Sequence, residues 1–559
     1  MNEEKIVVTN TAIIINDYNL GDCEALENIF RKWDPITHKY QTFGYFYDEA
    51  NKKLYLPSGM DLWKIKNWFN QKYYKRETEH PYQSINNILA KYRPRDNEQV
   101  EALKFMAGID QYADNYTSKQ LSVNLNTGKG KTYCSICTIC FFKIKSMIIT
   151  GSNTLLSQWE SEIIKYTNLN EKDIFHIVGS DTCNMILRNV SSKARDASIF
   201  LCSHGTLRSF GDTYGWDKVY ELFKKLGIGI KFFDEAHTNY LNMLMIDYFT
   251  NVYKTFYVTA TPGRSDWREN VVYQIASKNI PAIDLFNPDK DPHTSYIALK
   301  YNSNPGPKVV SRMKNKYGID RMKYVDWITT NDEFYKLLHV IMGMIKRIGG
   351  RTLMYIGTND GILRVYHWIA TNYPEYVGDI GIFSSLVSQE DKLKEKGKKL
   401  LLSTTKSAGL GEHIEGLKTT VCLAEPFKSE IIARQTLGRT RDADTYYIEV
   451  VDLAFYQIKN FYFGKLPVFN KYAKDTSDAH IDSYELEKRA QKIIDKRDIW
   501  QRRPLVLYDQ RFDFTEVLKY QEKKELEKKN KPYCPIHFVA NPNYKPDWLK
   551  KLEKEEEES

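Results

Sequence analysis

The stretch Asn126-Thr127-Gly128-Lys129-Gly130-Lys131-Thr132 decides the fold, because it has the form of a phosphate-binding loop. A polyphosphate needs several backbone N–H donors at close range, and glycine lets the chain curl tightly enough to point them inward. We expect Lys131 to reach the β- and γ-phosphates of a nucleotide, and the Thr132 hydroxyl to bind Mg²⁺. The predicted nucleotide-binding residues are Thr127, Gly128, Lys129, Gly130, Lys131 and Thr132. A surface turn rich in glycine and lysine is the alternative interpretation of this stretch alone.

An apolar run at residues 133–142 follows the loop and predicts a buried helix whose N-terminus faces the phosphates. It contains Cys134, Cys137 and Cys140, spaced three apart. Since no fourth ligand is close in sequence, we expect these thiols to point into the core rather than to hold a metal. The eight cysteines of the 559-residue chain do not predict a disulfide framework either.

An acidic motif follows a second apolar run, at residues 226–233, which predicts a buried strand. Asp234 and Glu235 stand at its carboxyl end, where open α/β sheets bind their ligands. We expect Asp234 to hold Mg²⁺, directly or through water, and Glu235 to orient and deprotonate the attacking water. A further predicted strand at 255–258 delivers Thr259-Ala260-Thr261, whose small hydroxyl side chains can link the acidic motif to the rest of the protein.

An arginine motif, Gln435-Thr436-Leu437-Gly438-Arg439-Thr440-Arg441, stands far downstream. With Asp234-Glu235-Ala236-His237 as the acidic motif, the ordered set resembles the superfamily 2 helicases of the DEAH type. The resemblance implies an α/β fold with two tandem RecA-like (P-loop NTPase) domains, which bind ATP and Mg²⁺ between them. It also implies an ATP hydrolase that moves along nucleic acid and unwinds it.

The resemblance also assigns roles residue by residue. Catalytic roles fall to Lys131, Asp234, Glu235, Gln435, Arg439 and Arg441, and the Mg²⁺ ligands are Thr132 and Asp234. Gln99 matches the upstream glutamine that reads adenine in many relatives. Coupling roles fall to Thr259, Thr261, His237 and Gly409. Nucleic-acid contacts fall to Thr150, Gly151, Thr206, Thr404 and Lys64. Thr150 and Gly151 open a matching segment, Thr150-Gly151-Ser152-Asn153-Thr154-Leu155-Leu156-Ser157-Gln158-Trp159.

Two departures from the family pattern bear on these roles. The second arginine, Arg441, comes one residue earlier than usual, so we expect Arg439 to be the principal finger on the γ-phosphate. The coupling motif usually ends in glycine, an apolar residue and aspartate, whereas here Gly411 follows Leu410 and Glu412 is the nearest acid.

Three segments resemble phage recombination and branch-migration helicases of the UvsW type more closely. They are Leu54-Tyr55-Leu56-Pro57-Ser58-Gly59 with the helix that follows it, the arginine-motif helix from Phe427, and Val450-Val451-Asp452-Leu453 with the aromatic, basic stretch after it. This resemblance implies branched or single-stranded DNA as substrate, favoured over RNA, in recombination, repair or replication restart. It also implies a basic N-terminal helix in which Ile65, Trp68 and Phe69 pack inward and leave lysines free for phosphates.

The predicted organisation has six parts. They are a small N-terminal α/β substrate-binding domain (1–85), a linker (86–94), a first RecA-like domain (95–300), an interdomain bridge (301–329), a second RecA-like domain (330–475) and a charged helical C-terminal extension with an acidic tail (476–559). Within the N-terminal domain, the pattern predicts strands near 5–8, 12–15, 40–47 and 53–56, and helices at 22–33 and 60–74.

Composition agrees with a nucleic-acid enzyme in the cytoplasm of a host cell. The net charge is +9 despite 71 acidic residues, and 13% of the residues are aromatic. We expect no membrane span, because no apolar run reaches about 18 residues. The N-terminus shows no signal-peptide pattern. A monomer with replication or recombination proteins as partners is the predicted state.

Three other functions stay open at this point. An RNA helicase or a viral transcription-termination factor uses the same motor, because the motor motifs do not separate DNA from RNA. A translocase subunit of a nuclease or restriction system is the second alternative, although no nuclease-type constellation stands out in the flanks. A binding protein with a degenerate motor is the third, and intact Lys131, Asp234, Glu235 and Arg439 argue against it.

Overall fold

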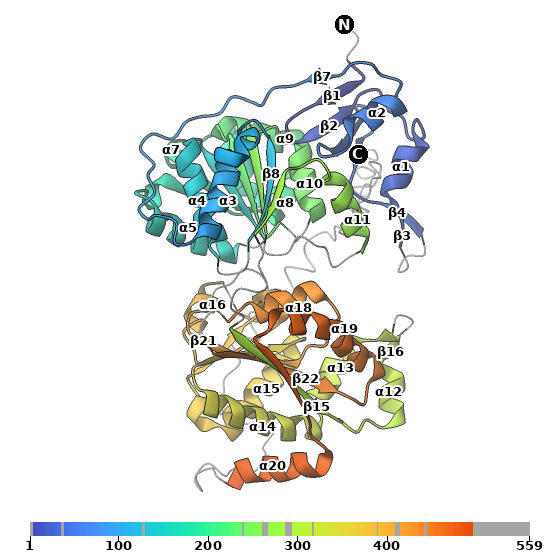
Figure 1. The fold of residues 1–559 in the computed structure, drawn as a ribbon, viewed down its shortest axis with the longest axis vertical. Helices are drawn as coiled ribbons and strands as arrows, with labels where there is room; N and C mark the ends of the chain where they lie inside the picture. The colour runs from blue at the N-terminus through green and yellow to red at the C-terminus, as the bar shows by residue number, and fades with distance from the viewer. Residues whose placement is uncertain are drawn as a thin grey trace, which may run out of the picture. The chain divides into compact units, whose positions relative to one another are not determined.

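A computed structural model describes residues 4–34, 39–125, 129–151, 153–236, 240–259, 267–285, 293–315, 318–387, 389–408, 414–440 and 444–495. They fall into two compact units, one ending at residue 285 and one beginning at residue 293 (Figure 1). Six predicted site residues lie outside the described residues: Thr127, Gly128, His237, Thr261, Gly409 and Arg441. The greater part of the predicted C-terminal extension, from residue 496, lies outside them as well.

The first unit begins with a five-stranded sheet in the order β5-β6-β2-β1-β7. Its strands are β1 (Ile6–Val8), β2 (Ala12–Ile15), β5 (Phe46–Asp48), β6 (Lys53–Pro57) and β7 (Lys75–Arg76). Two helices, α1 (Glu24–Phe30) and α2 (Leu62–Trp68), accompany the sheet. Helix α2 is shorter than the helix predicted at 60–74, because Phe69 already leaves the helical conformation. Within it Ile65 is buried and Lys64 is exposed, and Trp68 and Phe69 pack against the core.

The predicted helix at 22–33 is shorter in the structure. It ends at Phe30, because Arg31 takes an extended backbone with φ −85° and ψ 117°. Residues Arg31–Asp34 form strand β3, which pairs antiparallel with β4 (Lys39–Thr42) in a separate hairpin. Trp33 faces Tyr40 across this ladder, and such cross-strand aromatic pairs stabilise a hairpin. We call this element the β3–β4 hairpin.

A seven-stranded parallel sheet forms the rest of the first unit, in the order β10-β11-β9-β12-β13-β8-β14. Its strands are β8 (Gln120–Asn124), β9 (Ser146–Thr150), β10 (Ile174–Ile177), β11 (Ile199–Ser203), β12 (Ile230–Asp234), β13 (Lys254–Thr259) and β14 (Ala282–Asp284). The helices are α3 (Asn97–Ala107), α4 (Lys131–Phe142), α5 (Thr154–Tyr166), α6 (Ser180–Arg188), α7 (Ser192–Asp196), α8 (His204–Tyr214), α9 (Trp216–Leu226), α10 (Tyr240–Tyr248) and α11 (Trp267–Ala276). Buried apolar strands with crossover helices are typical of a parallel α/β sheet.

The strand expected at 226–233 begins later than predicted. Leu226 ends α9, and Gly227 at φ +67° closes that helix in the left-handed conformation that glycine adopts without a Cβ clash. Strand β12 then starts at Ile230.

The N-terminal domain and the first α/β sheet share one hydrophobic core. Asn10 donates from its side-chain amide to the carbonyl of Val252 at 2.9 Å. The Tyr248 hydroxyl of α10 donates to the carbonyl of Gly44 at 2.6 Å. A Cβ added at Gly59 would lie 1.9 Å from the carbonyl oxygen of Ala276, so the two backbones touch there. The small sheet is therefore packed directly onto α10 and α11.

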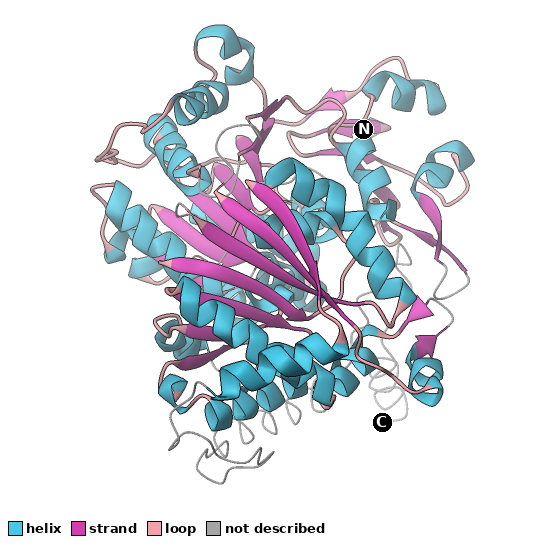
Figure 2. Cartoon of the chain, turned by 60° about the horizontal axis from the view of Figure 1, so that its bottom comes forward, coloured by secondary structure: helices cyan, strands magenta, loops and turns pink. Residues whose placement is uncertain are grey.

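The second unit contains another seven-stranded parallel sheet, in the order β19-β20-β18-β21-β22-β15-β23. Its strands are β15 (Thr294–Tyr301), β18 (Arg351–Ile356), β19 (Ile380–Phe383), β20 (Leu400–Ser403), β21 (Leu417–Ala424), β22 (Thr445–Asp452) and β23 (Asp475–His480). The helices are α12 (Pro307–Met313), α13 (Arg321–Ile328), α14 (Asp332–Ile348), α15 (Asn359–Asn372), α16 (Gln389–Glu395), α17 (Thr405–Ala408), α18 (Glu430–Leu437), α19 (Tyr456–Tyr472) and α20 (Ser483–Asp495). Figure 2 shows the strands with helices packed against them. The two sheets confirm the predicted tandem RecA-like fold with a small N-terminal sheet.

Two predicted domain boundaries differ from the sheet topology. Residues 294–300 fall inside the predicted first RecA-like domain (95–300), but they belong to strand β15, which pairs with β22 and β23 in the second sheet. Packing explains this, since the Tyr296 ring stacks on Phe469 at 4.0 Å and on Tyr447 at 5.9 Å. The predicted extension from 476 likewise begins inside the sheet, because residues Asp475–His480 form its edge strand β23. In the described part of the chain, no helix is both long and apolar enough to cross a membrane.

Candidate nucleotide-binding site

The predicted nucleotide residues gather where three neighbouring strands end. Strand β13 lies between β8 and β12, and the register pairs Asp234 with Val258 and Thr259 with Asn124. The loop that leaves β8 is fixed to β13, because the backbone N–H of Leu125 donates to the carbonyl of Thr259 at 3.0 Å. The end of β8, the start of the acidic motif at Asp234 and Thr259 thus share one edge of the sheet.

Gln99 holds the phosphate loop from the side. Its amide nitrogen donates to the carbonyl of Lys129 at 3.1 Å, and its amide oxygen accepts from the backbone N–H of Arg95 at 3.0 Å. Gly130 has φ +89°, and a Cβ there would lie 2.3 Å from the Gln99 amide nitrogen. Only glycine fits this position. The structure therefore places Gln99 against the loop, with both polar atoms of its amide bonded to the backbone.

Lys131 begins helix α4 directly after Gly130 and reaches the acidic motif. Its Nζ lies 3.6 Å from Oε1 of Glu235, and the two side chains are only 10% and 12% exposed. Glu235 has φ +50°, a left-handed conformation that costs a non-glycine residue about 1 kcal/mol or more. Such strain, when a fold maintains it, is typical of functional sites.

Both oxygens of the Asp234 carboxylate accept hydrogen bonds. Oδ1 accepts from the backbone N–H of Glu235 at 3.0 Å, and Oδ2 accepts from the indole N–H of Trp159 at 2.9 Å. Burial, together with the neighbouring Glu235 charge, raises the pKa of Asp234 to about 6, although Lys131 and the indole N–H oppose the shift. A buried carboxylate with a raised pKa next to a second carboxylate gains most from a bound cation, so this oxygen donor set fits Mg²⁺.

The structure also places the predicted residues of the second unit. Arg439 follows α18 and is 7% exposed. Burial raises the pKa of Tyr355 on β18, and the Arg439 guanidinium opposes that shift, which places the two side chains close together. Gln435 lies on α18, and this helix is fixed to the sheet by the Thr436 hydroxyl, 3.1 Å from the Tyr447 hydroxyl.

The residues predicted to contact nucleic acid differ in how deeply they are buried. Thr150 ends β9 beside Ser203 at the end of β11, so the two predicted segments share a sheet edge. Thr206 is buried and bonded to the Ser203 hydroxyl at 3.1 Å, while Gly151 is partly exposed. The Thr404 hydroxyl accepts from the backbone N–H of Ser407 at 3.0 Å in α17. Thr150 and Thr206 thus make internal contacts at this edge.

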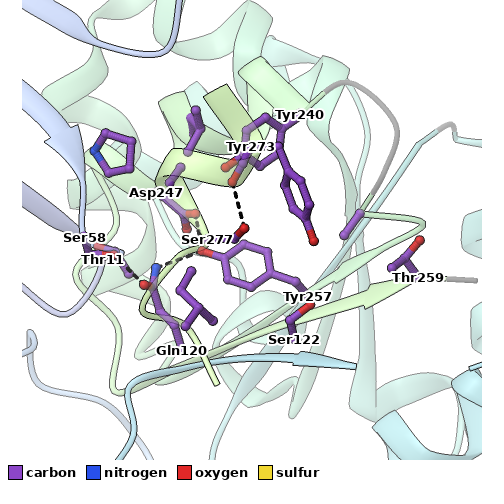
Figure 3. A pocket seen from close by; sticks show the side chains of 15 residues that line it. Thr11, Ser58, Gln120, Ser122, Tyr240, Asp247, Tyr257, Thr259, Tyr273 and Ser277 are labelled. Atoms are coloured by element: carbon purple, nitrogen blue, oxygen red, sulfur yellow. Dashed lines mark hydrogen bonds between the residues drawn. The ribbon is translucent and has the colours of Figure 1, made fainter. Parts of the chain in front are cut away.

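The sequence did not predict a polar cluster that lies behind the acidic motif. Tyr257 donates to the Asp247 carboxylate at 2.5 Å and accepts from the Gln120 amide at 2.8 Å (Figure 3). Ser58 of the N-terminal domain hydrogen-bonds to Gln120. Fully buried Lys231 lies 2.5 Å from Asp247. These residues line or underlie a small cavity of about 30 Å³ that also touches Thr259. These polar residues come from three strands, one helix and a turn, and no sequence signal unites them.

Trp159 also escaped the sequence reasoning, although it stands in a segment that matches the family. The segment ends at Trp159, and a tryptophan followed by acidic residues on a helix gives no hint that its N–H reaches a carboxylate 75 residues away. Cys134 is buried in the core behind the phosphate loop, and Cys137 and Cys140 pack against that core.

Part of the chain is similar to a known protein family. Residues 79–264 match the family model described as the type III restriction enzyme, res subunit. No curated protein matches the sequence. Among solved structures, S. cerevisiae Dbp5 bound to RNA and ADP BeF3 is 15% identical, with TM-score 0.46, over 71% of this chain and 97% of that one. T4 UvsW is 14% identical, with TM-score 0.33, over 86% and 99%. Mss116p bound to single-stranded RNA and AMP-PNP is 13% identical, with TM-score 0.48, over 75% and 85%.

Proposed function

We propose that this chain is an ATP-dependent helicase or translocase that acts on branched DNA in recombination, repair or replication restart. The observation that carries the proposal is the cluster of Lys131, Glu235 and Asp234 at the shared strand edge beside the phosphate loop. A lysine between a phosphate loop and two carboxylates is the arrangement that phosphoryl transfer to water needs.

The proposed chemistry assigns each residue one task. Thr132 and Asp234 hold Mg²⁺, which neutralises phosphate charge when it is bound. The γ-phosphate draws Lys131 away from Glu235, so the freed Glu235 carboxylate orients water and takes its proton. Arg439, supported by Gln435 and Arg441, stabilises charge on the transferring phosphoryl group. The coupling residues transmit the effect of ATP hydrolysis to the segments that bind the nucleic-acid strand. These residues are Thr259, Thr261, His237 and Gly409.

The proposed grip on nucleic acid is directed at phosphates. Gly151 and the exposed Lys64 are the best placed of the predicted contacts, with Thr150, Thr206 and Thr404 shaping the loops around them. Contact with phosphates rather than bases gives salt-sensitive binding with little sequence preference. A monomer in the host cytoplasm, working with replication or recombination proteins, suits this activity.

The alternative function is a viral RNA helicase or transcription-termination translocase with the same motor. One experiment separates the two: ATPase stimulation by single-stranded DNA, forks, four-way junctions and RNA duplexes of matched length, followed by unwinding assays on the same substrates. Stronger stimulation by forks and junctions supports the proposal. RNA as the best activator supports the alternative, and the absence of any ATPase activity excludes both. Glu235→Gln is the negative control.

A further inference from the structure

The β3–β4 hairpin presents a distinctive face that no motif explains. It forms its own two-stranded sheet, separate from the five-stranded sheet. The register pairs Arg31 with Thr42 and Trp33 with Tyr40. Because side chains alternate along a strand and partners share a face, Arg31, Trp33 and Tyr40 stand on the same face. We call it the aromatic hairpin face.

The base of the hairpin is anchored in the first unit. The backbone N–H of Phe43 donates to the carbonyl of Phe30 at 2.9 Å, and both rings are buried. At the next residue, the carbonyl of Gly44 accepts from the Tyr248 hydroxyl of α10 at 2.6 Å. A Cβ at Gly44 would lie 2.3 Å from a methyl of Val272 in α11. The base of the hairpin is therefore in direct contact with helices α10 and α11.

The aromatic hairpin face combines exposed rings with positive charge. Trp33 is 43% exposed and Tyr40 is 60% exposed, with ring centres 5.3 Å apart in an edge-to-face pair. The Arg31 guanidinium lies 4.9 Å from the centre of the Tyr40 ring. The two strands, RKWD and KYQT, carry three basic residues and one acidic residue. Large rings are costly to leave in water, and rings beside cations are the usual platform for unpaired nucleobases.

We infer that the aromatic hairpin face binds unpaired bases of a nucleic acid, which stack on Trp33 and Tyr40 while Arg31 meets the adjacent phosphate. This inference rests on the proposed function and narrows its substrate to nucleic acid with a single-stranded arm. A duplex hides the faces of its bases, so it cannot use the platform. The net positive charge of the hairpin favours a polyanion over a basic or neutral protein surface as its occupant, and the exposed rings favour one that presents bases.

Binding of oligonucleotides to the full-length chain tests the inference. Trp33→Ala and Tyr40→Ala remove exposed rings, whereas Trp33→Phe keeps a stacking surface. Tyr484→Ala is the matched control, because Tyr484 is 76% exposed on α20 of the other unit. Fluorescence anisotropy gives the affinity for a single strand, a fork and a blunt duplex at several salt concentrations. A 2-aminopurine in the single strand reports stacking directly through its quenching.

We expect the alanine variants to weaken binding of single strands and forks but not of duplexes. Trp33→Ala weakens single-strand and fork binding by about fivefold or more and abolishes most of the 2-aminopurine quenching, while duplex affinity stays within about twofold. Its salt slope equals that of the wild type, since the variant keeps every basic residue that meets a phosphate. Trp33→Phe restores most of the affinity, and Tyr484→Ala changes nothing.

Two results overturn the inference. One is unchanged single-strand affinity and quenching in both alanine variants, which leaves a protein partner as the occupant of the face. The other is equal weakening on single strand and duplex. ATPase activity of the wild type, measured in the same experiment, keeps the proposed function separate: if nucleic acid fails to stimulate it, that function fails whatever the hairpin binds.

Discussion

The indole N–H of Trp159 donates to the Asp234 carboxylate across 2.9 Å, so helix α5 is tied directly to the proposed Mg²⁺ ligand. Trp159→Phe keeps the buried ring and removes the hydrogen bond, which leaves the carboxylate free to turn. We expect kcat to fall by roughly tenfold and the Mg²⁺ concentration for half-maximal activity to rise, because hydrogen bonds to charged groups contribute about 1.5 kcal/mol or more. A Mg²⁺ titration of ATPase activity measures both effects. Trp63→Phe on exposed α2 is the control, and equal behaviour of the two variants would contradict the assignment.

The second prediction concerns Glu235 as the proposed general base. Glu235→Gln keeps the shape of the side chain and loses the proton acceptor, so nucleotide binding should persist while turnover falls by at least ~10²-fold. Lys131→Ala should weaken nucleotide binding as well, since it removes a phosphate contact. Binding of a fluorescent ATP analogue and steady-state hydrolysis separate the two variants. Hydrolysis by Glu235→Gln at the wild-type rate would show that another group activates water.

The two arginines of the motif should differ. Arg439 is buried beside Tyr355, and Arg439→Ala should abolish most nucleic-acid-stimulated hydrolysis while single-stranded binding persists, because a finger acts on the transition state. Arg441→Ala should do less, since Arg441 stands one residue earlier than the family's second arginine. Single-turnover hydrolysis on saturating single-stranded DNA compares them. Equal losses would reverse this ranking.

The burial of Asp234 predicts a pH-dependent stability. Its folded pKa of about 6 lies above the ordinary value near 4, so the folded state binds the proton more tightly. Stability from this group is full below pH 4 and is lost as the pH rises toward 6. Asp234→Asn should therefore be more stable than the wild type by about 2 kcal/mol at pH 7.5 in EDTA, with no difference below pH 4. Denaturant unfolding measures this, and a variant less stable at pH 7.5 would contradict it.

Helix α2 and the residues that follow it, as far as strand β7, should contribute phosphate contacts. Lys64, Lys72 and Lys75 are exposed, and Lys75 pairs only loosely with Glu77 at 3.6 Å. Changing all three to glutamine should weaken binding to forks and lower the slope of log K against log salt by roughly one unit for each lysine that meets a phosphate. Maximal ATPase activity at saturating DNA should remain. The triple variant Lys172→Gln, Lys193→Gln, Lys218→Gln is the charge-matched control. If the slope of log K against log salt equals that of the wild type, the region that carries these lysines binds a protein and not phosphates.

The order of the motifs predicts much of this site, because a phosphate loop and an acidic motif each indicate a strand that ends directly before them. Lys131 and Glu235 are brought together for that reason. Sequence could not place β15, because a strand that alternates between buried and half-buried residues fits either sheet. Only the stacking of Tyr296 on Phe469, 173 residues later, decides the matter. The roles of Trp159 and of the β3–β4 hairpin could not be predicted for a similar reason. Both depend on contacts that no local sequence pattern indicates.

The core shared by the N-terminal domain and the first RecA-like domain has a consequence for synthesis. Asn10 is bonded to Val252, 242 residues further along the chain, and Gly59 touches Ala276. Strands β1, β2 and β6 therefore cannot complete their packing until α10 and α11 have been made. Contacts so distant in sequence form slowly, and apolar surface stays open meanwhile. The nascent chain should need a chaperone over this interval, and residues 1–90 alone should not form a folded domain.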